Sequence, residues 1–95
     1  MKGYVVCVYK NITNEEKLKE YAVKARVAVE KFKGKFFVRG GRSTSNEGTK
    51  SPRTVVIEFP SYDQANTFYQ SKEYQEAHSV LKGYADRQHQ TVEGT

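Results

Sequence analysis

The sequence predicts an α+β domain with the element order β-α-β-β-α-β. Short runs rich in β-branched residues alternate with segments whose apolar residues recur every three or four positions. Two of these runs, residues 3–9 and 53–59, are apolar on both faces, which is typical of central, covered strands. The 95 residues have room for one hydrophobic core, so residues 1–95 are expected to form a single domain.

A helix is predicted to follow the first strand. Thr13 and Glu16 have the spacing of a capping box, which indicates a helix over residues 14–32. Gly34 stands where helices often end in a left-handed conformation. The residues expected on the buried face of this helix are Leu18, Tyr21, Ala22, Ala25, Val29 and Phe32.

A hairpin is predicted next. Residues 35–42 form its first strand, which Gly40 and Gly41 are expected either to weaken or to bulge near its end. Residues 43–52 are polar and without periodicity, so they are expected to form a mobile loop. Residues 53–59 form the third strand, and Pro60 ends it because proline has no backbone N–H to donate.

The second helix is predicted in two segments. Ser61 can cap the first segment and Ser71 the second, since a serine oxygen accepts hydrogen bonds from the N–H groups of a first turn. Gly83 is expected to end the second segment. Residues 87–92 alternate without much apolar content, which predicts a polar edge strand.

Right-handed crossovers arrange these elements as a split βαβ, ferredoxin-like fold with a four-stranded antiparallel sheet in the order 4-1-3-2. In this order, the two strands that are apolar on both faces lie at the centre. The helices can cover only one face of the sheet. The other face, which includes Val56, is therefore predicted to pack against the same face of a second copy, giving a homodimer.

Short segments along the whole chain also carry a family resemblance. They are residues 2–4 (KGY), Tyr21, 39–42 (RGGR), 56–61 (VIEFPS), 69–71 (YQS), 73–75 (EYQ) and 92–94 (VEG). With these segments the sequence resembles domain-of-unknown-function family 1330. The resemblance implies a dimeric α+β barrel, in which two ferredoxin-like sheets pack face to face. That superfamily includes cofactor-free monooxygenases, heme-degrading enzymes, dehydratases, isomerases and ligand-sensing domains, so the resemblance implies a fold rather than one activity.

Two places depart from the pattern of that family. Lys82 stands where an arginine is frequent, and the last strand contains Arg87 and His89 where apolar residues are usual. The polar residues indicate either that this strand lies less deeply in the barrel or that it contacts a ligand.

Composition narrows the classes of function. Sixteen Lys and Arg against 11 Asp and Glu give a net charge of +5, which suits anionic partners. The charges are spread along the chain, which does not favour nucleic acid as the partner. No apolar run is long enough to span a membrane and no signal peptide precedes the first strand, so a cytoplasmic location is expected. The single cysteine, Cys7, is expected to be a small core residue.

Three side chains are candidates for chemistry. Arg39 and Glu58 share a parity on adjacent predicted strands, so they can form a register-fixing ion pair, or Glu58 can orient Arg39 as an anchor for an anion. His78 lies on the helix face directed toward the sheet, where it is either a general base in catalysis or an ordinary helix histidine. His89 is expected on the surface. No partner stands at a metal-ligand spacing and no dinucleotide loop appears, so no metal site and no cofactor are predicted.

Four tyrosines are expected to point inward. They either pack in the core or line a cleft between helices and sheet, with Arg39 and His78 at its polar end. The leading hypothesis is a homodimer that binds a small anionic organic molecule in this cleft. The alternatives are a cofactor-independent oxygenase or isomerase, and a purely structural dimer. The four tyrosines are Tyr4, Tyr21, Tyr69 and Tyr74.

Overall fold

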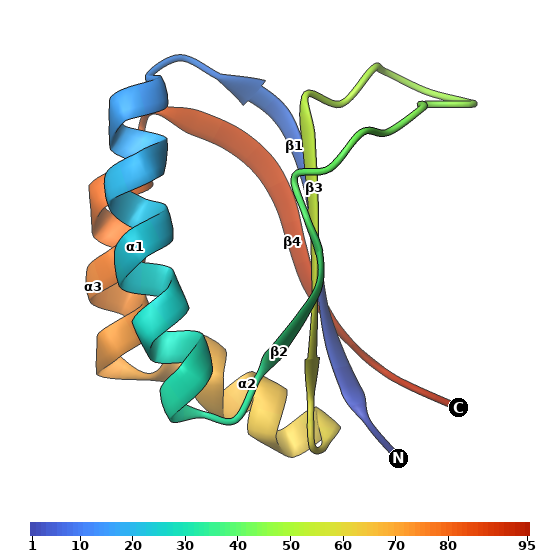
Figure 1. The fold of residues 1–95 in the computed structure, drawn as a ribbon, viewed down its shortest axis with the longest axis vertical. Coiled ribbons are helices and arrows are strands. Elements are labelled where there is room, and N and C mark those ends of the chain that lie inside the picture. The colour runs from blue at the N-terminus through green and yellow to red at the C-terminus, as the bar shows by residue number, and fades with distance from the viewer.

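The computed structural model describes residues 1–95 and confirms the predicted order of elements (Figure 1). The antiparallel sheet has the order β2-β3-β1-β4, which is the predicted order read from the other edge. The strands are β1 (Gly3–Ile12), β2 (Lys35–Arg39), β3 (Arg53–Phe59) and β4 (Ala85–Glu93), and the helices are α1 (Glu15–Lys31), α2 (Tyr62–Gln70) and α3 (Lys72–Leu81).

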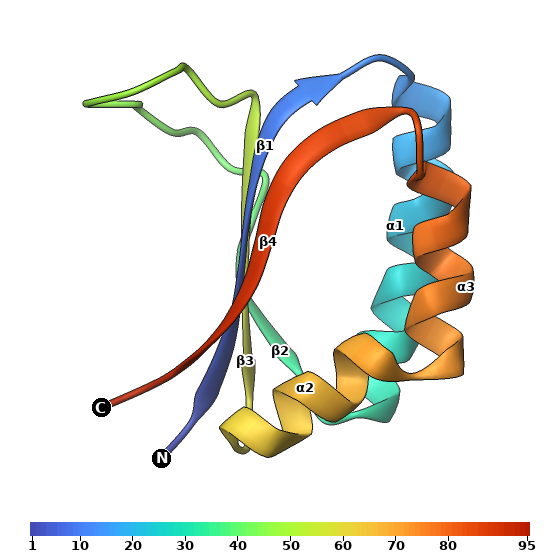
Figure 2. The ribbon, with the colours of Figure 1, turned by 180° about the vertical axis from the view of Figure 1, so that it is seen from behind.

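The molecule has two layers. All three helices lie on one face of the sheet, and the other face is bare (Figures 1 and 2). Both chain termini and the loop that joins β2 to β3 project on the side of the bare face (Figure 1). Residues 40–50 of this loop are exposed throughout.

The hydrophobic core lies between the helices and the sheet. Every second residue of β1 contributes to it, since side chains alternate along a strand, and α1 contributes residues at helical spacing. Cys7 is buried in this core, as predicted. The buried residues are Val5, Cys7, Tyr9, Leu18, Tyr21, Ala25, Ala28, Val29, Ile57, Phe59, Ala65, Phe68, Tyr74, Ala77 and Leu81.

The start of α1 differs from the prediction. Asn14 caps the helix in an extended conformation, and its side-chain oxygen accepts from the backbone N–H of Lys17 at 3.0 Å. The hydroxyl of Thr13 donates instead to the backbone carbonyl of Tyr84 at 3.0 Å. The predicted capping box is therefore wrong, because Thr13 links the start of α1 to the turn that leads into β4.

The predicted break in the second helix is confirmed. The Ser61 hydroxyl oxygen accepts from the N–H of Gln64 at 3.0 Å, and the Ser71 hydroxyl oxygen accepts from the N–H of Tyr74 at 3.1 Å. Each serine satisfies a donor that a first helical turn leaves free. Gly83 follows α3 with a φ of 89°, so the predicted end of this helix is also confirmed.

The turn after α1 uses its glycine for a different reason from the predicted one. The left-handed residue is Lys33, with a φ of 65°. Gly34 is instead needed for close packing, because a Cβ there would lie 2.7 Å from side-chain atoms of both Val29 and Phe59. These two residues are almost fully buried, so neither has space to retreat.

Gly34→Ala is therefore expected to lower the free energy of unfolding by about 1–3 kcal/mol, because the added methyl group overpacks the core. Gly41→Ala is the matched control, since a Cβ at that position has open space around it. This control should change the free energy of unfolding by less than about 0.5 kcal/mol. Urea denaturation measures both values, and equal stability of the two variants would contradict the packing argument.

Candidate functional site

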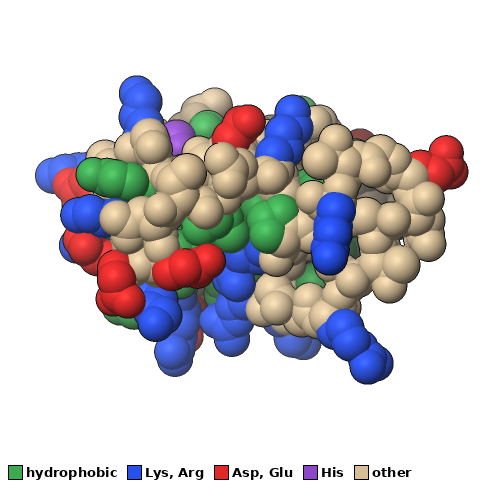
Figure 3. All heavy atoms as spheres, turned by 90° about the horizontal axis from the view of Figure 1, so that it is seen from above, with side chains coloured by type: hydrophobic (Ala, Val, Ile, Leu, Met, Phe, Trp, Pro, Cys, Tyr) green, Lys and Arg blue, Asp and Glu red, His purple; other side chains and the backbone are tan.

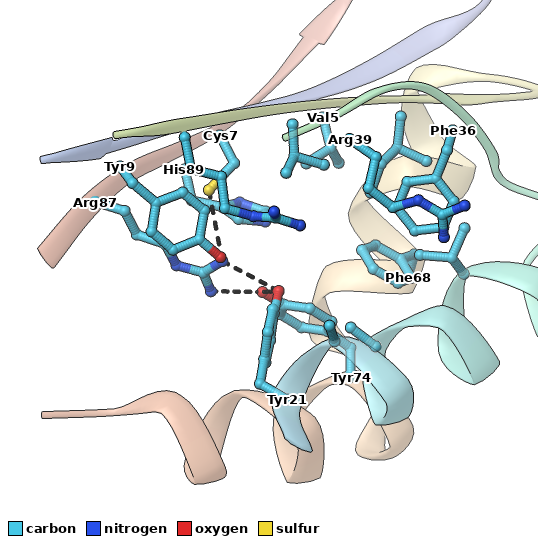
Figure 4. A pocket seen from close by; sticks show the side chains of 16 residues that line it. Val5, Cys7, Tyr9, Tyr21, Phe36, Arg39, Phe68, Tyr74, Arg87 and His89 are labelled. Atoms are coloured by element: carbon cyan, nitrogen blue, oxygen red, sulfur yellow. Dashed lines mark hydrogen bonds between the residues drawn. The ribbon is translucent and has the colours of Figure 1, made fainter. Parts of the chain in front are cut away.

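A cavity of about 60 Å³ lies between the helices and the sheet (Figure 4). One water needs at least about 10–15 Å³ of such space, so the cavity has room for a small ligand. Twelve of its 16 lining residues are hydrophobic, and the others are concentrated on the sheet side. The polar and sulfur-bearing lining residues used below are Cys7, Tyr9, Tyr21, Arg39, Arg53, Tyr74, Arg87 and His89.

The strand register places these polar residues in rows across the sheet. Tyr9 of β1 lies opposite Arg53 of β3 on one side and opposite Arg87 of β4 on the other. Cys7 lies opposite His89 in the neighbouring row. Because Tyr9 and Cys7 are buried under the helices, their cross-strand partners also face the helices.

Arg87 is the centre of a cluster with three tyrosines (Figure 4). Its Nη1 donates to the hydroxyls of Tyr9 at 3.2 Å and Tyr21 at 3.1 Å, and its Nη2 donates to the hydroxyl of Tyr74 at 2.7 Å. The hydroxyls of Tyr21 and Tyr74 are also hydrogen-bonded to each other at 2.9 Å. A half-buried cation is thus surrounded by neutral oxygens and has no carboxylate partner.

The ionisation of this cluster leaves one positive charge inside the molecule. Burial alone would lower the pKa of Arg87, but the surrounding oxygens of Tyr21 and Tyr74 and the sulfur of Cys7 outweigh it, and the pKa is raised. Burial raises the pKa of Tyr9 to about 12 and also raises the pKa of Tyr74. Tyr9 and Tyr74 are therefore neutral at physiological pH, and the guanidinium of Arg87 stays charged.

Two further guanidinium groups line the same cavity. Arg39 lies over the ring of Phe36, with 4.2 Å between the guanidinium carbon and the ring centroid. Arg53 lies at 5.9 Å from the ring of Tyr9, and its Nε is buried without a hydrogen-bond partner. Neither arginine forms an ion pair, because all ion pairs of the protein join other residues. The cavity is thus lined by three cations and no carboxylate.

The predicted pair of Arg39 and Glu58 is wrong. The register of β2 shifts between Phe36 and Val38, so Arg39 lies opposite Val55 and faces the helices. Such a bulge moves all later residues of a strand to the other face. Glu58 lies on the bare face, where it accepts a hydrogen bond from the Tyr4 hydroxyl at 3.0 Å.

The structure therefore brings together only some of the predicted site residues. Tyr21, Tyr74 and Arg39 line the cavity, and Tyr69 lies beside it against His89. Tyr4 does not point inward as expected, because it shares the bare face with Glu58.

The two histidines occupy different positions. His78 stacks on the ring of Tyr74, at 6.1 Å and an angle of 11°, and lines an open surface hollow of about 310 Å³ between α3 and β4 rather than the cavity. His89 was expected on the surface but is half-buried, with its ring 4.9 Å from that of Tyr69. Arg87 and His89 line both the cavity and the hollow, so they separate the two spaces.

The structure contains neither a metal-binding cluster nor a helix suited to span a membrane. No group of three His, Cys, Asp or Glu side chains is arranged to bind a metal ion. None of the helices combines the length and the apolar character that crossing a membrane requires.

The fold and the cavity define a ferredoxin-like α+β domain whose cavity is lined by three arginines. Residues 2–95 match the family described as Domain of unknown function (DUF1330), and the chain belongs to that family. The resemblance identified from the sequence is thereby confirmed. A comparison with curated proteins found no match.

Solved structures share the fold at low sequence identity. A protein of unknown function from Rhodopseudomonas palustris superposes with a TM-score of 0.78 at 13% identity, covering 99% of this chain and 82% of that one. A dimeric ferredoxin-like protein from Jannaschia sp. CCS1 gives 0.67 at 9% identity, covering 99% and 100%. A dimeric protein of ferredoxin-like fold from Bacteroides fragilis gives 0.59 at 17% identity, covering 98% and 96%.

His89 should make the stability of the fold depend on pH. Burial lowers its pKa from 6.5 to about 3, and the charge of Arg87 acts in the same direction. Above pH 6.5 His89 is neutral in both the folded and the unfolded chain, so this contribution to stability is complete. As the pH falls toward 3, the unfolded chain binds a proton that the folded protein does not, and the free energy of unfolding decreases.

Between pH 7 and pH 5 the unmodified protein should lose about 1–2 kcal/mol more stability than His89→Gln. Urea denaturation of both proteins at the two pH values measures this difference. All other titrating groups, including His78, are present in both proteins and cancel. Parallel losses in the two proteins would show that His89 protonates in the folded state as readily as in water.

Proposed function

We propose that the protein binds a small anionic organic molecule in the cavity between the helices and the sheet. The observation that supports this most directly is the convergence of Arg39, Arg53 and Arg87 on one cavity without a carboxylate. Arg53 and Arg87 are half-buried, whereas Arg39 is exposed. Charged side chains that are partly removed from water are normally paired with an opposite charge or fully hydrogen-bonded. A bound anion would supply the missing charge.

The chemistry of the lining also suits such a ligand. A guanidinium group binds carboxylates and phosphates through two parallel hydrogen bonds, and Arg53 has a buried Nε–H that lacks an acceptor. The rest of the lining is mainly aliphatic and aromatic, which suits the carbon skeleton of an organic molecule.

The surface supports this function over nucleic-acid binding. Seen from above, basic and acidic side chains are mixed at the part of the molecule where the helices lie (Figure 3). Several surface lysines are paired with glutamates, such as Lys31 of α1 with Glu73 of α3. Of the arginines without an ion pair, Arg39, Arg53 and Arg87 line the cavity, whereas Arg42 lies in the exposed loop. Catalysis by His78 would require a substrate in the surface hollow, whereas the cations converge on the inner cavity, so binding is the favoured function.

We also propose that the bare face of the sheet joins two copies in a homodimer. Val8, Phe37, Val38 and Val92 are each more than a third exposed on the strands of this sheet, and the half-buried Val56 lies on the same face near its centre. An apolar sheet face of this kind is normally covered by protein. Two of the similar solved structures are described as dimeric, which supports a second copy as the cover.

Benzoate is expected to bind the protein, and its neutral analogue benzamide is not. The ring suits the aromatic side chains of Phe36 and Phe68, which lie near Arg39 in the cavity (Figure 4). Arg39→Gln should weaken benzoate binding about tenfold, because a hydrogen bond to a charged group contributes about 1.5–3 kcal/mol. Isothermal titration calorimetry measures the affinities.

Arg42→Gln is the matched control for this experiment. It removes the same charge from an exposed loop position outside the cavity and should leave the affinity unchanged. Equal binding of benzoate and benzamide, or equal losses in the two variants, would rule out an anion site at Arg39.

Val56→Asp should convert the dimer into a monomer or unfold it, because a carboxylate would enter a dry interface without a partner. Val23→Asp is the matched control, since Val23 is 68% exposed on α1, away from the sheet. Sedimentation velocity measures the association state, and circular dichroism shows whether the variant is folded. A monomeric unmodified protein, or a Val56→Asp dimer, would contradict the proposed interface.

A further inference from the structure

We infer that the ligand is a dianion, a short linear dicarboxylate whose two carboxylates bind at Arg53 and at Arg87. This inference rests on the proposed function and narrows it to one class of molecule. It depends on how the register of the sheet distributes positive charge along the cavity.

The two arginines flank one tyrosine. Arg53 and Arg87 lie opposite Tyr9 on its two neighbouring strands, so their backbones are two strand spacings, or about 10 Å, apart. Their guanidinium carbons are 5.9 and 5.5 Å from the centroid of the Tyr9 ring, and the sum of these distances limits their separation to 11.4 Å. The two charges therefore lie on either side of Tyr9, within the reach of one small molecule.

The third arginine, Arg39, adds positive charge at the end of the cavity where Arg53 lies. Arg39 is on β2, next to β3, and Figure 4 shows it at the opposite end of the cavity from Arg87. The cavity thus has two separate cationic ends. A monoanion would neutralise one end and leave the other uncompensated, whereas a dianion neutralises both.

Both ends can bind a carboxylate directly. The guanidinium of Arg53 has a buried Nε–H without an acceptor. The Nη atoms of Arg87 donate to tyrosine hydroxyls, but a guanidinium has five N–H donors, and the hydroxyl protons of Tyr9 or Tyr74 can also turn toward a carboxylate.

Tyr9 lies between Arg53 and Arg87, and the sheet surface beside it is suited to a hydrocarbon chain. In the row next to Tyr9, the residues between Arg39 and His89 are Val55 and Cys7, whose side chains are small and apolar. Neither offers a strong hydrogen-bond partner to a polar linker. A methylene spacer between the two carboxylates is therefore the expected connection.

The test compares succinate, glutarate, adipate and pimelate with the monocarboxylates of equal chain length, namely butyrate, pentanoate, hexanoate and heptanoate. Isothermal titration calorimetry with the full-length protein gives each affinity. At the best chain length the dicarboxylate should bind at least tenfold more tightly than its matched monocarboxylate. This gain should decrease for both shorter and longer members of the series.

Arg53→Gln should weaken the best dicarboxylate at least fivefold and its matched monocarboxylate by a smaller factor, because Arg39 and Arg87 remain available to a single carboxylate. Monocarboxylates that bind as tightly as dicarboxylates would overturn the dianion inference and leave the proposed anion site intact. Failure of every member of both series to bind would instead remove the proposed function, and the inference with it. The comparison of ligands on the unmodified protein tests the inference even if Arg53→Gln does not fold.

Discussion

The hydrogen bonds from Arg87 to three tyrosines are the interaction on which the arrangement of the layers depends. The arginine comes from the edge strand β4, and its acceptors come from β1, α1 and α3. Removing a cation from water costs several kcal/mol unless hydrogen bonds replace its hydration. Because the acceptors come from three elements, this guanidinium is satisfied only when both α1 and α3 stand in one position over the sheet.

The same arrangement explains why a cavity lies between the helices and the sheet. Tyr21 and Tyr74 point their hydroxyls toward Arg87, and their rings meet edge to face at 6.2 Å. These long side chains keep the helices and the sheet apart, whereas small aliphatic residues would let the two layers close on each other. Three cations beside one cavity repel each other. Part of this repulsion is offset because Arg39 and Arg53 lie over aromatic rings, whose faces are partly negative.

The fold was predictable because its signals are local. Strands that are apolar on both faces belong at the centre of the sheet, and serine caps mark the two segments of the second helix. The site was less predictable. A single bulge in β2 sends Arg39 to the helical face, and no sequence pattern marks it. In β4 all residues from Arg87 to Gln90 are polar. The sequence therefore does not show whether the odd-numbered or the even-numbered residues of this strand face the helices. The only sign in the sequence that Arg87 and His89 could belong to a site was the departure of this strand from the family pattern.

The edge position of β4 explains why the charged end of the cavity lies next to the molecular surface. A central strand has its helix-facing side closed by neighbours, whereas Arg87 and His89 also border the surface hollow beside α3. An anion can therefore approach Arg87 without disturbing the central strands β1 and β3. The opposite face of those same strands carries Val6 and Val56, which pair directly across the sheet. Since side chains alternate along each strand, the proposed anion site and the proposed dimer interface lie on different residues of the same strands.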